Sequence, residues 1–426
     1  MVPRPRPRPR PSPGQTYHSS ILIRNQPPYP SIFHISLSLS HSLYNYNYNY
    51  NCCVHCDSGI PTVFEPYWRR MGDKCRVVIQ GCDLMSYRAT TTNLCWYLLP
   101  ELEEAIRRLH RVVGNAVVDE RHVVVGTGST QLFQAALYAL STPAAAAAAP
   151  QPINVVSAAP YYSCYPDETD YLCSRLYKWA GDANQYDSKS GPFIEVVTSP
   201  NNPDGCLREP VVEAHGQGKL IHDLAYYWPQ FTPITRPADH DLMYFTFSKC
   251  TGHAGSRIGW ALVKDREVAI KMTKYMDLSS IGVSKDSQFR AAKIMELLCN
   301  NYDQKLGSNF SNNFFEYGKS LMAERWKSLR DVIGRSDVFS LPTFEQQYCC
   351  FFGRLSQSYP AFAWLRCKEE IEDCGSFLRE HKIEGRSGRR FGADAKYLRI
   401  SMLSSDDVFQ QFLERLSAIK ILNNAN

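Results

Sequence analysis

Short apolar runs alternate with longer amphipathic segments through the middle of the chain. Strands are predicted where apolar residues end in polar or glycine-containing turns, at about 122–125, 154–158, 194–198, 219–222, 242–247 and 258–263. The clearest helical pattern between them is Pro100–His110, which starts with proline and pairs Glu103 with Arg107 at i,i+4. This alternation predicts an α/β fold whose mostly parallel sheet is covered by helices on both faces.

The pattern changes at about residue 301. A helical run from 314 to 332 is followed by short strand-like runs near 349–353 and 398–402, and an amphipathic helix is predicted over 406–421. We therefore expect a large domain at 96–300, preceded by a segment at 57–95, and a smaller α+β domain at 301–426. The alanine run at 144–149 lies between two prolines and is expected to be a loop.

The first 56 residues differ in composition from the rest. Arg-Pro and Asn-Tyr repeats are of low complexity and predict a tail that builds no core. The serine-rich, arginine-containing and acid-free composition is also that of an organelle transit peptide, and a segment absent from the translated protein is a third alternative. We expect a cytoplasmic protein.

Charge and hydropathy limit the classes of partner. The net charge of +5 equals the five arginines of residues 1–56, so 42 basic and 42 acidic residues remain in the body of the chain. A neutral body gives no electrostatic reason to expect binding to nucleic acid or to an anionic membrane. No run approaches the roughly 20 apolar residues of a membrane span.

The fifteen cysteines are scattered through apolar runs. Without an evident signal peptide, we expect buried free thiols in a reducing compartment rather than a disulfide framework. The cysteines in apolar runs include Cys82, Cys95, Cys164, Cys299, Cys349 and Cys350. The Cys53-Val-His-Cys56 motif has no second pair at zinc-finger spacing, so no metal site is expected.

The strand-like run that ends at Phe247 carries the first chemical signal. It is followed by Ser248 and Lys249, then by a glycine-rich segment and Arg257. A lysine at the mouth of a sheet can lose its proton and form a Schiff base with an aldehyde. A hydroxyl and a guanidinium beside it can hold a phosphate. The combination points to pyridoxal phosphate, with an ordinary surface lysine as the alternative.

Three upstream segments support this cofactor. Gly126–Gln131 joins a strand to a helix start, where free backbone N–H groups bind phosphate. Ser199–Gly205 is an Asn-Pro-rich turn that contains Asn202. The apolar run that ends in Asp223 brings a carboxylate to the sheet edge at which α/β proteins bind ligands, and Tyr226 follows three residues later. Each segment alone is weak, but the four in this order are specific.

With these motifs the sequence resembles the fold-type I pyridoxal-phosphate enzymes, and among them the plant alliinase-like branch that contains the tryptophan aminotransferases of auxin synthesis. The resemblance covers about residues 57–421. The sequence departs from the family at Ile60, where the family has an acidic residue, and in the short link at 206–219. We expect neither change to touch a catalytic group. The matching runs are 65–73, 81–87, 92–96, 225–229, 247–257 and 359–364.

The resemblance implies roles for individual cofactor-binding residues. Lys249 would hold the cofactor and shuttle the substrate proton, and Asp223 would pair with the pyridine nitrogen. Asn202 and Tyr226 would bind the 3′-oxygen of the ring, on which Tyr162 would stack. The phosphate ligands would be Ser129, Thr130, Gln131, Ser248 and Arg257.

Two further roles concern the substrate and the partner subunit. Arg399 would bind the substrate α-carboxylate, and Tyr87 would reach the phosphate of a neighbouring subunit, which implies a homodimer with shared active sites. Structural alternatives are a helix N-cap for Asp223, core packing for the tyrosines, and an ion pair for Arg399.

The reaction implied is transfer of the amino group of L-tryptophan to a 2-oxo acid, which yields indole-3-pyruvate on a route to auxin. The rival is the alliinase reaction, β-elimination of a cysteine sulfoxide, which starts from the same Cα carbanion; a cofactor-binding protein without catalysis is a third hypothesis. The lyases have a cysteine-rich module before the catalytic domain, whereas this chain has only Cys52, Cys53 and Cys56 there, which favours the aminotransferase. The acceptor, pyruvate or 2-oxoglutarate, stays open. Candidates for an aromatic side-chain pocket, with core packing as the alternative, are Trp96, Tyr97, Phe133 and Tyr161.

Overall fold

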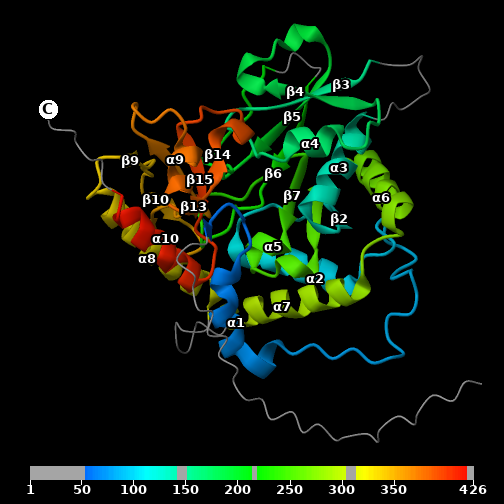
Figure 1. Ribbon diagram of the computed structural model, residues 1–426. Helices are drawn as coiled ribbons and strands as arrows, with labels where there is room; N and C mark the ends of the chain where they lie inside the picture. Colours follow the sequence, from blue (N-terminus) through cyan, green and yellow to red (C-terminus); the bar gives the residue numbers. More distant parts are fainter. Residues whose placement is uncertain (1–52, 142–150, 214–217, 304–312, 420–426) are drawn as a thin grey trace, which may run out of the picture. The chain divides into compact units, whose positions relative to one another are not determined.

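A seven-stranded sheet forms the centre of the computed structural model, which describes residues 53–141, 151–213, 218–303 and 313–419 (Figure 1). The strand order is β2-β8-β7-β6-β5-β3-β4. The strands from β7 to β4 are parallel to their neighbours, whereas β8 is antiparallel to both β7 and β2. The predicted mostly parallel α/β sheet is therefore confirmed. Its strands are β2 (His122–Gly126), β3 (Ile153–Ser157), β4 (Tyr177–Asp182), β5 (Phe193–Thr198), β6 (Gly218–Asp223), β7 (Leu242–Thr246) and β8 (Gly259–Val263).

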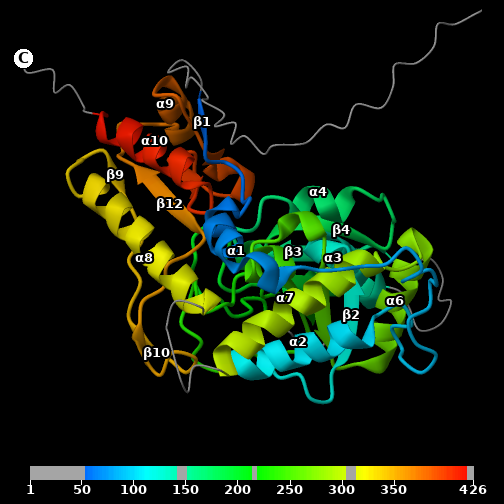
Figure 2. The ribbon, with the colours of Figure 1, turned by 90° about the horizontal axis from the view of Figure 1, so that it is seen from below.

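Helices cover both faces of this sheet because successive strand residues point to opposite sides. On β7, Phe245 packs against His110 of α2, while the neighbouring Tyr244 lies on the side of Tyr165 in α4. Figure 2 shows α2 and α7 side by side, and α3 packs on α6. The helices are α2 (Pro100–Val113), α3 (Gly128–Ser141), α4 (Tyr165–Asp170), α5 (Phe247–Cys250), α6 (Arg266–Ser280) and α7 (Lys285–Asp303).

The C-terminal part contains a four-stranded antiparallel sheet of order β14-β15-β12-β9. Helices α8 and α10 lie next to each other (Figure 1). The elements are α8 (Phe314–Ile333), β9 (Phe339–Ser340), β10 (Gln347–Cys349), β11 (Arg354–Ser356), β12 (Phe362–Cys367), α9 (Cys374–Glu380), β13 (Ile383–Glu384), β14 (Arg386–Ser387), β15 (Tyr397–Ser401) and α10 (Asp406–Ser417).

The strand predicted near 349–353 is wrong for most of that range. Cys350 to Gly353 form the turn of a hairpin that pairs β10 with β11, and Gly353 has a φ of +64°. Apolar residues in a turn imitate the pattern of a buried strand. The alanine run at 144–149, which is predicted to be a loop, lies outside the described residues.

The N-terminal segment packs on the C-terminal part. Strand β1 (Val54–His55) pairs in parallel with β13, and the short helix α1 (Glu65–Met71) follows. The described residues fall into one compact unit, so the division at residue 300 stays a prediction. None of the helices in the described part of the chain combines the length and apolar composition needed to cross a bilayer.

The cysteines are not all free thiols as predicted. Cys367 at the end of β12 and Cys374 at the start of α9 form a disulfide with a Cα–Cα distance of 5.7 Å across a sequence separation of seven residues. Among the free thiols, Cys95, Cys299 and Cys349 are buried, Cys164 is half-buried, and Cys82 and Cys350 are exposed rather than buried.

Candidate active site

The predicted site residues gather at the carboxyl ends of the parallel strands, at the edge where open α/β sheets bind ligands. Ten of the twelve line one cavity of about 280 Å³. These ten are Ser129, Thr130, Tyr162, Asn202, Asp223, Tyr226, Ser248, Lys249, Arg257 and Arg399.

Lys249 lies in α5, a four-residue helix that starts directly after β7. The side chain of Thr246 caps this helix by accepting from the backbone N–H of Ser248 at 3.2 Å. The Lys249 ammonium donates to the carbonyl oxygen of Gly59. Burial, then the charges of Arg399 and Arg257, lower the pKa of Lys249 from 10.5 to about 7. A large fraction of this amine is therefore uncharged near neutral pH, as a nucleophilic lysine requires.

Asp223 ends β6 and is buried among neutral partners. Its Oδ2 accepts from the Tyr165 hydroxyl at 2.7 Å, and its Oδ1 accepts from the backbone N–H of Ala225 at 3.0 Å. Burial raises the pKa of Asp223, and the hydrogen bonds from Tyr165 and Ala225 counter this effect. A buried carboxylate with neutral partners is suited to meet a cationic ring nitrogen.

Asn202, which follows β5 of the central sheet, is hydrogen-bonded to Arg399 of the C-terminal sheet. Arg399, in the middle of β15, donates to Asn202 Oδ1 at 3.0 Å and to the Asp57 carbonyl at 2.5 Å. Since a guanidinium only donates, this bond fixes the Asn202 oxygen toward Arg399 and turns the amide nitrogen toward Tyr226. Burial raises the pKa of the Tyr226 hydroxyl, and the Arg399 charge and the hydrogen bond from Asn202 oppose this.

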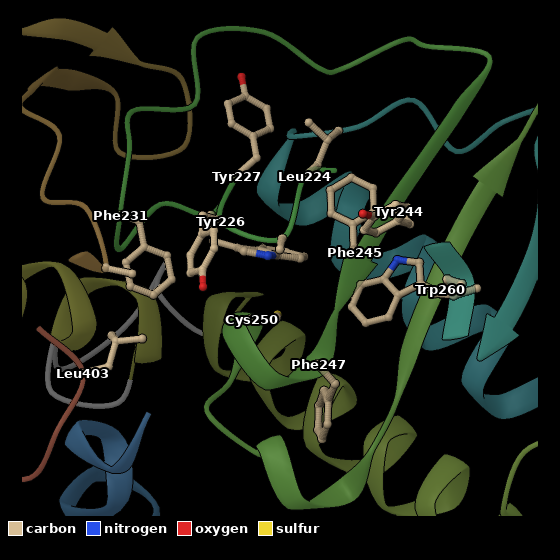
Figure 3. Close-up of a cluster of buried hydrophobic side chains, with 14 of the residues drawn as sticks. Leu224, Tyr226, Tyr227, Phe231, Tyr244, Phe245, Phe247, Cys250, Trp260 and Leu403 are labelled. Carbon is tan, nitrogen blue, oxygen red and sulfur yellow. The ribbon is translucent and has the colours of Figure 1, made fainter. Parts of the chain in front are cut away.

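Tyr226 and the adjacent Tyr227 point in opposite directions (Figure 3). Tyr226 lines the cavity, whereas the Tyr227 hydroxyl donates to the Arg236 carbonyl at 2.8 Å. Of the pair Tyr161 and Tyr162, Tyr162 lines the cavity and Tyr161 packs edge-on against Trp179.

A cradle for an anion is formed by the start of α3 and by Arg257. Gly128 has a φ of +80°, and a Cβ added to it would lie 2.5 Å from Arg257 Nη2, so only glycine allows this approach. Arg257 itself has a φ of +51° and is anchored by a 3.0 Å hydrogen bond from Nη1 to the Ala254 carbonyl. Backbone N–H groups at a helix start, hydroxyls and a guanidinium are the groups that bind phosphate.

Two predicted residues do not line the cavity. Gln131 instead accepts from the Thr127 N–H at 2.7 Å and donates to Ser279 and Ser280, so its side chain closes the turn before α3. Tyr87 is 73% exposed on a segment without helix or strand, which excludes the alternative of a core tyrosine.

None of the four aromatic candidates for a side-chain pocket lines the cavity either. Tyr97 and Phe133 are buried in the core, where the Tyr97 hydroxyl donates to the Val125 carbonyl at 3.1 Å. Trp96 is half-buried beside Arg88, and Tyr161 beside Trp179.

Five residues that sequence reasoning did not assign also shape the site. Phe362, Arg386 and Thr198 line the cavity together with Gly59, and Tyr165 holds Asp223. The spacing of Tyr165, three residues after Tyr162 at a helix start, is a signal that could have indicated it. Arg386 belongs to a two-residue strand, which leaves no pattern in the sequence.

The departure at Ile60 lies at the candidate site. Ile60 lines the cavity, and the carbonyl of the preceding Gly59 accepts from Lys249, because the pairing of β1 with β13 brings this segment over the cavity. Of the second departure, at 206–219, residues 214–217 lie outside the described residues.

The fold is that of the fold-type I aminotransferases. The aspartate aminotransferase from Thermus thermophilus with maleate superposes with a TM-score of 0.60 at 18% identity, over 86% of this chain and 91% of that one. The sequence model of the family Allinase matches residues 54–420, and the chain belongs to this alliinase family.

Curated relatives carry two kinds of name. Tryptophan aminotransferase-related protein 2 of Oryza sativa subsp. japonica is 55% identical over 374 residues, which is 86% of this chain and 73% of that protein. Alliin lyase of Allium cepa var. aggregatum is 37% identical over 366 residues, which is 85% of this chain and 80% of that protein.

Proposed function

We propose that this protein is a pyridoxal-phosphate-dependent aminotransferase that transfers the amino group of L-tryptophan to a 2-oxo acid and forms indole-3-pyruvate. The observation that carries the proposal is the convergence in one cavity of Lys249, whose pKa is lowered to about 7, with Asp223 and Arg399. The name of the rice relative at 55% identity supports the choice of tryptophan. The product is the first intermediate of an indole-3-pyruvate route to auxin.

The lining residues fit each chemical group of pyridoxal phosphate. Ser248, Ser129, Thr130 and Arg257 would hold the phosphate, in the cradle that a side chain at Gly128 would fill. Asp223 would face the ring nitrogen, with Asn202 and Tyr226 at the ring oxygen and Tyr162 against the ring face. Gln131 would contribute through the turn that its side chain closes. When bound, the cofactor supplies the electron sink that makes the substrate Cα–H bond acidic.

The protein's own groups bind the substrate and move the proton. The Arg399 fork would bind the α-carboxylate and orient the Cα–H bond, since Arg399 is 2% exposed and its Nε has no hydrogen-bond partner among the described residues. The Lys249 amine, whose pKa is lowered to about 7, would be the base that takes the proton from the substrate Cα and returns it later.

A homodimer with shared sites is part of the proposal. Tyr87 is exposed on a segment that also exposes Met85 (83%), and its role would be to reach the phosphate of the partner subunit. Mixing Tyr87→Ala protein with Lys249→Ala protein tests this, because a hybrid dimer contains one intact site only if the two residues act across the interface. Recovery of activity on mixing supports sharing, and no recovery contradicts it.

The alliinase reaction is the second candidate, since a relative at 37% identity is named alliin lyase. Purified protein is given L-tryptophan with pyruvate or with 2-oxoglutarate, and separately a cysteine sulfoxide alone. Indole-3-pyruvate formed in step with acceptor loss, and absent in Lys249→Ala, is the expected result. Accumulation of pyruvate from the sulfoxide alone, without tryptophan turnover, would establish the lyase instead.

A further inference from the structure

A carboxylate contacts one of the hydroxyls of the anion cradle. Helix α4 lies next to α3 (Figure 1), and the Thr130 hydroxyl at the start of α3 donates to Glu168 Oε1 of α4 at 3.1 Å. Thr130 lines the cavity, whereas Glu168 is not among the lining residues. A carboxylate beside a phosphate ligand is unfavourable, because the two anions repel each other and compete for the same hydroxyl proton.

No cation neutralises Glu168 within the described part of the chain. The nearest charges are those of Asp223 at the end of β6 and Asp167 in the same helix, and both are negative. Helix α3 carries no charged residue. The exposed Lys178 of β4, which packs on α4, makes no ion pair with Glu168. Other titratable groups on the elements around Glu168 are Tyr162, Tyr165, Asp170, Asp182 and Tyr244.

These surroundings make the protonation state of Glu168 sensitive to a further anion. Burial raises the pKa of Glu168 from 4.5 to about 7, opposed by the hydrogen bond from Thr130 and reinforced by the charges of Asp223 and Asp167. Both protonation states are therefore populated near neutral pH. A phosphate bound beside Thr130 adds negative charge and favours the protonated state.

The two states of Glu168 direct the single hydroxyl proton of Thr130 differently. A charged carboxylate only accepts, so the Thr130 proton points at Glu168 and is lost to a phosphate. A protonated carboxyl group can donate to Thr130 Oγ1 instead. The Thr130 proton is then free to donate into the cradle. Protonation of Glu168 thus converts Thr130 from a donor to the protein into a donor to an anion.

We propose that Glu168 is a positioning residue that takes up a proton when the cofactor phosphate binds, and that this proton turns the Thr130 hydroxyl toward the phosphate. The inference rests on the proposed function, because it takes Thr130 as a ligand of the phosphate. The step balances: one proton from solvent is added to Glu168, no covalent bond between heavy atoms changes, and the charge of the site rises by one. Through this residue, phosphate affinity falls as pH rises above about 7.

Binding of pyridoxine 5′-phosphate to the apoprotein tests the proton uptake. This probe carries the phosphate but no aldehyde, so it forms no imine with Lys249. Calorimetric titration in buffers of different ionisation enthalpy counts the protons taken up per bound probe. At pH 8 we expect the wild type to take up about one proton more than Glu168→Gln, whereas at pH 6 the two counts should agree because Glu168 is already protonated. Equal counts at pH 8 would overturn the proposal.

The affinity of the same probe gives a readout that a structural role would move in the opposite direction. In Glu168→Gln the amide N–H can donate to Thr130 Oγ1 at every pH, as the protonated carboxyl group does. We therefore expect the variant to bind the probe about tenfold more tightly than the wild type at pH 8, and equally at pH 6. Loss of packing would weaken binding at both pH values. Weaker or equal binding by Glu168→Gln at pH 8 contradicts the proposal.

Two further variants separate the hydroxyl from the charge. Asp167→Asn removes the neighbouring exposed charge without touching Thr130 and is the matched control, so its proton count at pH 8 should equal that of the wild type. In a Thr130→Val background the gain from Glu168→Gln should shrink from about tenfold to about threefold or less, because only the repulsion between anions remains. The full gain in that background would show that Thr130 has no part in the effect, and the proposal would be wrong.

The outcomes distinguish this inference from the proposed function. If the probe binds with a proton uptake that depends on Glu168 but tryptophan is not converted, the tryptophan aminotransferase fails and the role of Glu168 stands. If tryptophan is converted while the proton counts of wild type and Glu168→Gln are equal, the proposed function stands and the role of Glu168 is refuted. Absence of probe binding to the wild type at both pH values would refute the two together.

Discussion

The Tyr165 hydroxyl donates a 2.7 Å hydrogen bond to Oδ2 of Asp223, between residues 58 positions apart in the sequence. The same hydroxyl lies 2.6 Å from Thr198 Oγ1. Since the single tyrosine proton goes to the carboxylate, Thr198 must be the donor in the second bond. Thr198, Tyr165 and Asp223 therefore form a buried chain of donors that points at the carboxylate and stabilises its charged form.

Removal of this hydroxyl should weaken the candidate site without removing a residue that lines it. In Tyr165→Phe, Asp223 loses a bond that keeps its pKa down, so its charged form becomes less stable. We expect kcat to fall and the cofactor dissociation constant to rise, each by about tenfold, as for loss of a hydrogen bond to a charged group. Absorbance titration and steady-state kinetics measure the two effects. Tyr161→Phe removes a hydroxyl outside the cavity and is the control; matching behaviour of the two variants would contradict the positioning role.

Gly128 and Arg257 should act as one unit in cofactor binding. A side chain at Gly128 would have to take a φ of +80° and would meet Arg257 Nη2 at 2.5 Å. Gly128→Ala should therefore push Arg257 aside and raise the cofactor dissociation constant by about 10–100-fold, which is the size of a lost charge-assisted contact. Titration of the apoprotein with cofactor measures it.

A matched control separates the contact from the backbone strain. Gly114 also has a positive φ (+71°), but a Cβ there has no atom within 4 Å. Gly114→Ala should lower stability by about 1–2 kcal/mol, the cost of a left-handed backbone, while cofactor affinity stays at the wild-type value. Wild-type cofactor affinity in Gly128→Ala would show that Arg257 does not need its present position.

Attachment of the cofactor should depend on pH with a midpoint near 7. The uncharged amine of Lys249 is the nucleophile, and its pKa is lowered to about 7, chiefly by burial. Its reactive fraction therefore grows as pH rises through 7 and is constant above, whereas an ordinary lysine would need a pH near 10.5. The rate of the absorbance change on mixing apoprotein with pyridoxal phosphate reports this fraction.

A charge variant tests the second cause of the lowered pKa. The Arg399 charge also lowers the pKa of Lys249, so the midpoint should move upward in Arg399→Gln but stay below 10.5, because burial remains. Lys249→Arg should show no such absorbance change at any pH. A midpoint that does not respond to Arg399 would mean that this charge is screened from Lys249.

The sequence predicted those parts of the site that lie at the ends of regular elements. Asp223 ends a strand that an apolar run indicates, and Lys249 and Ser129 each come three residues after such a strand. An α/β fold places these positions at one edge of its parallel sheet. The central fold was predictable for the same reason, although β4, at the sheet edge, was missed because only Tyr177 of its six residues is buried.

Pairings between strands that lie far apart in the sequence could not be predicted from local sequence patterns. Arg386 enters the site through a two-residue strand, and the segment at Gly59 through the pairing of β1 with β13. The Cys367–Cys374 disulfide likewise depends on how α9 returns to β12. The wrong strand at 349–353 has the opposite cause, a local apolar run that the hairpin places in its turn.

Proton binding to His110 in the unfolded chain should make the protein less stable at acid pH. His110 is fully buried, and its Nε2 lies 2.9 Å from Trp260 Nε1, which can only donate, so Nε2 is the acceptor. Its Nδ1 then donates to Asn115 Oδ1 at 2.8 Å, and Asn115 donates to the Tyr227 carbonyl at 2.7 Å. A proton on Nε2 would break the bond to Trp260. Burial accordingly lowers the pKa of His110 from 6.5 to about 4.

The sign of the pH effect follows from this lowered pKa. Between about pH 6.5 and 4 the unfolded chain binds a proton at His110 and the folded chain does not, so the free energy of unfolding falls as pH falls. For this residue the loss between pH 7 and pH 5 is about 2 kcal/mol. Urea unfolding of wild type and His110→Gln at both pH values measures it: the variant is less stable at pH 7, but its further loss at pH 5 should be smaller than that of wild type by about 2 kcal/mol. An equal loss in the two proteins would mean that His110 is protonated in the folded state, and the hydrogen bond from Trp260 could not then exist.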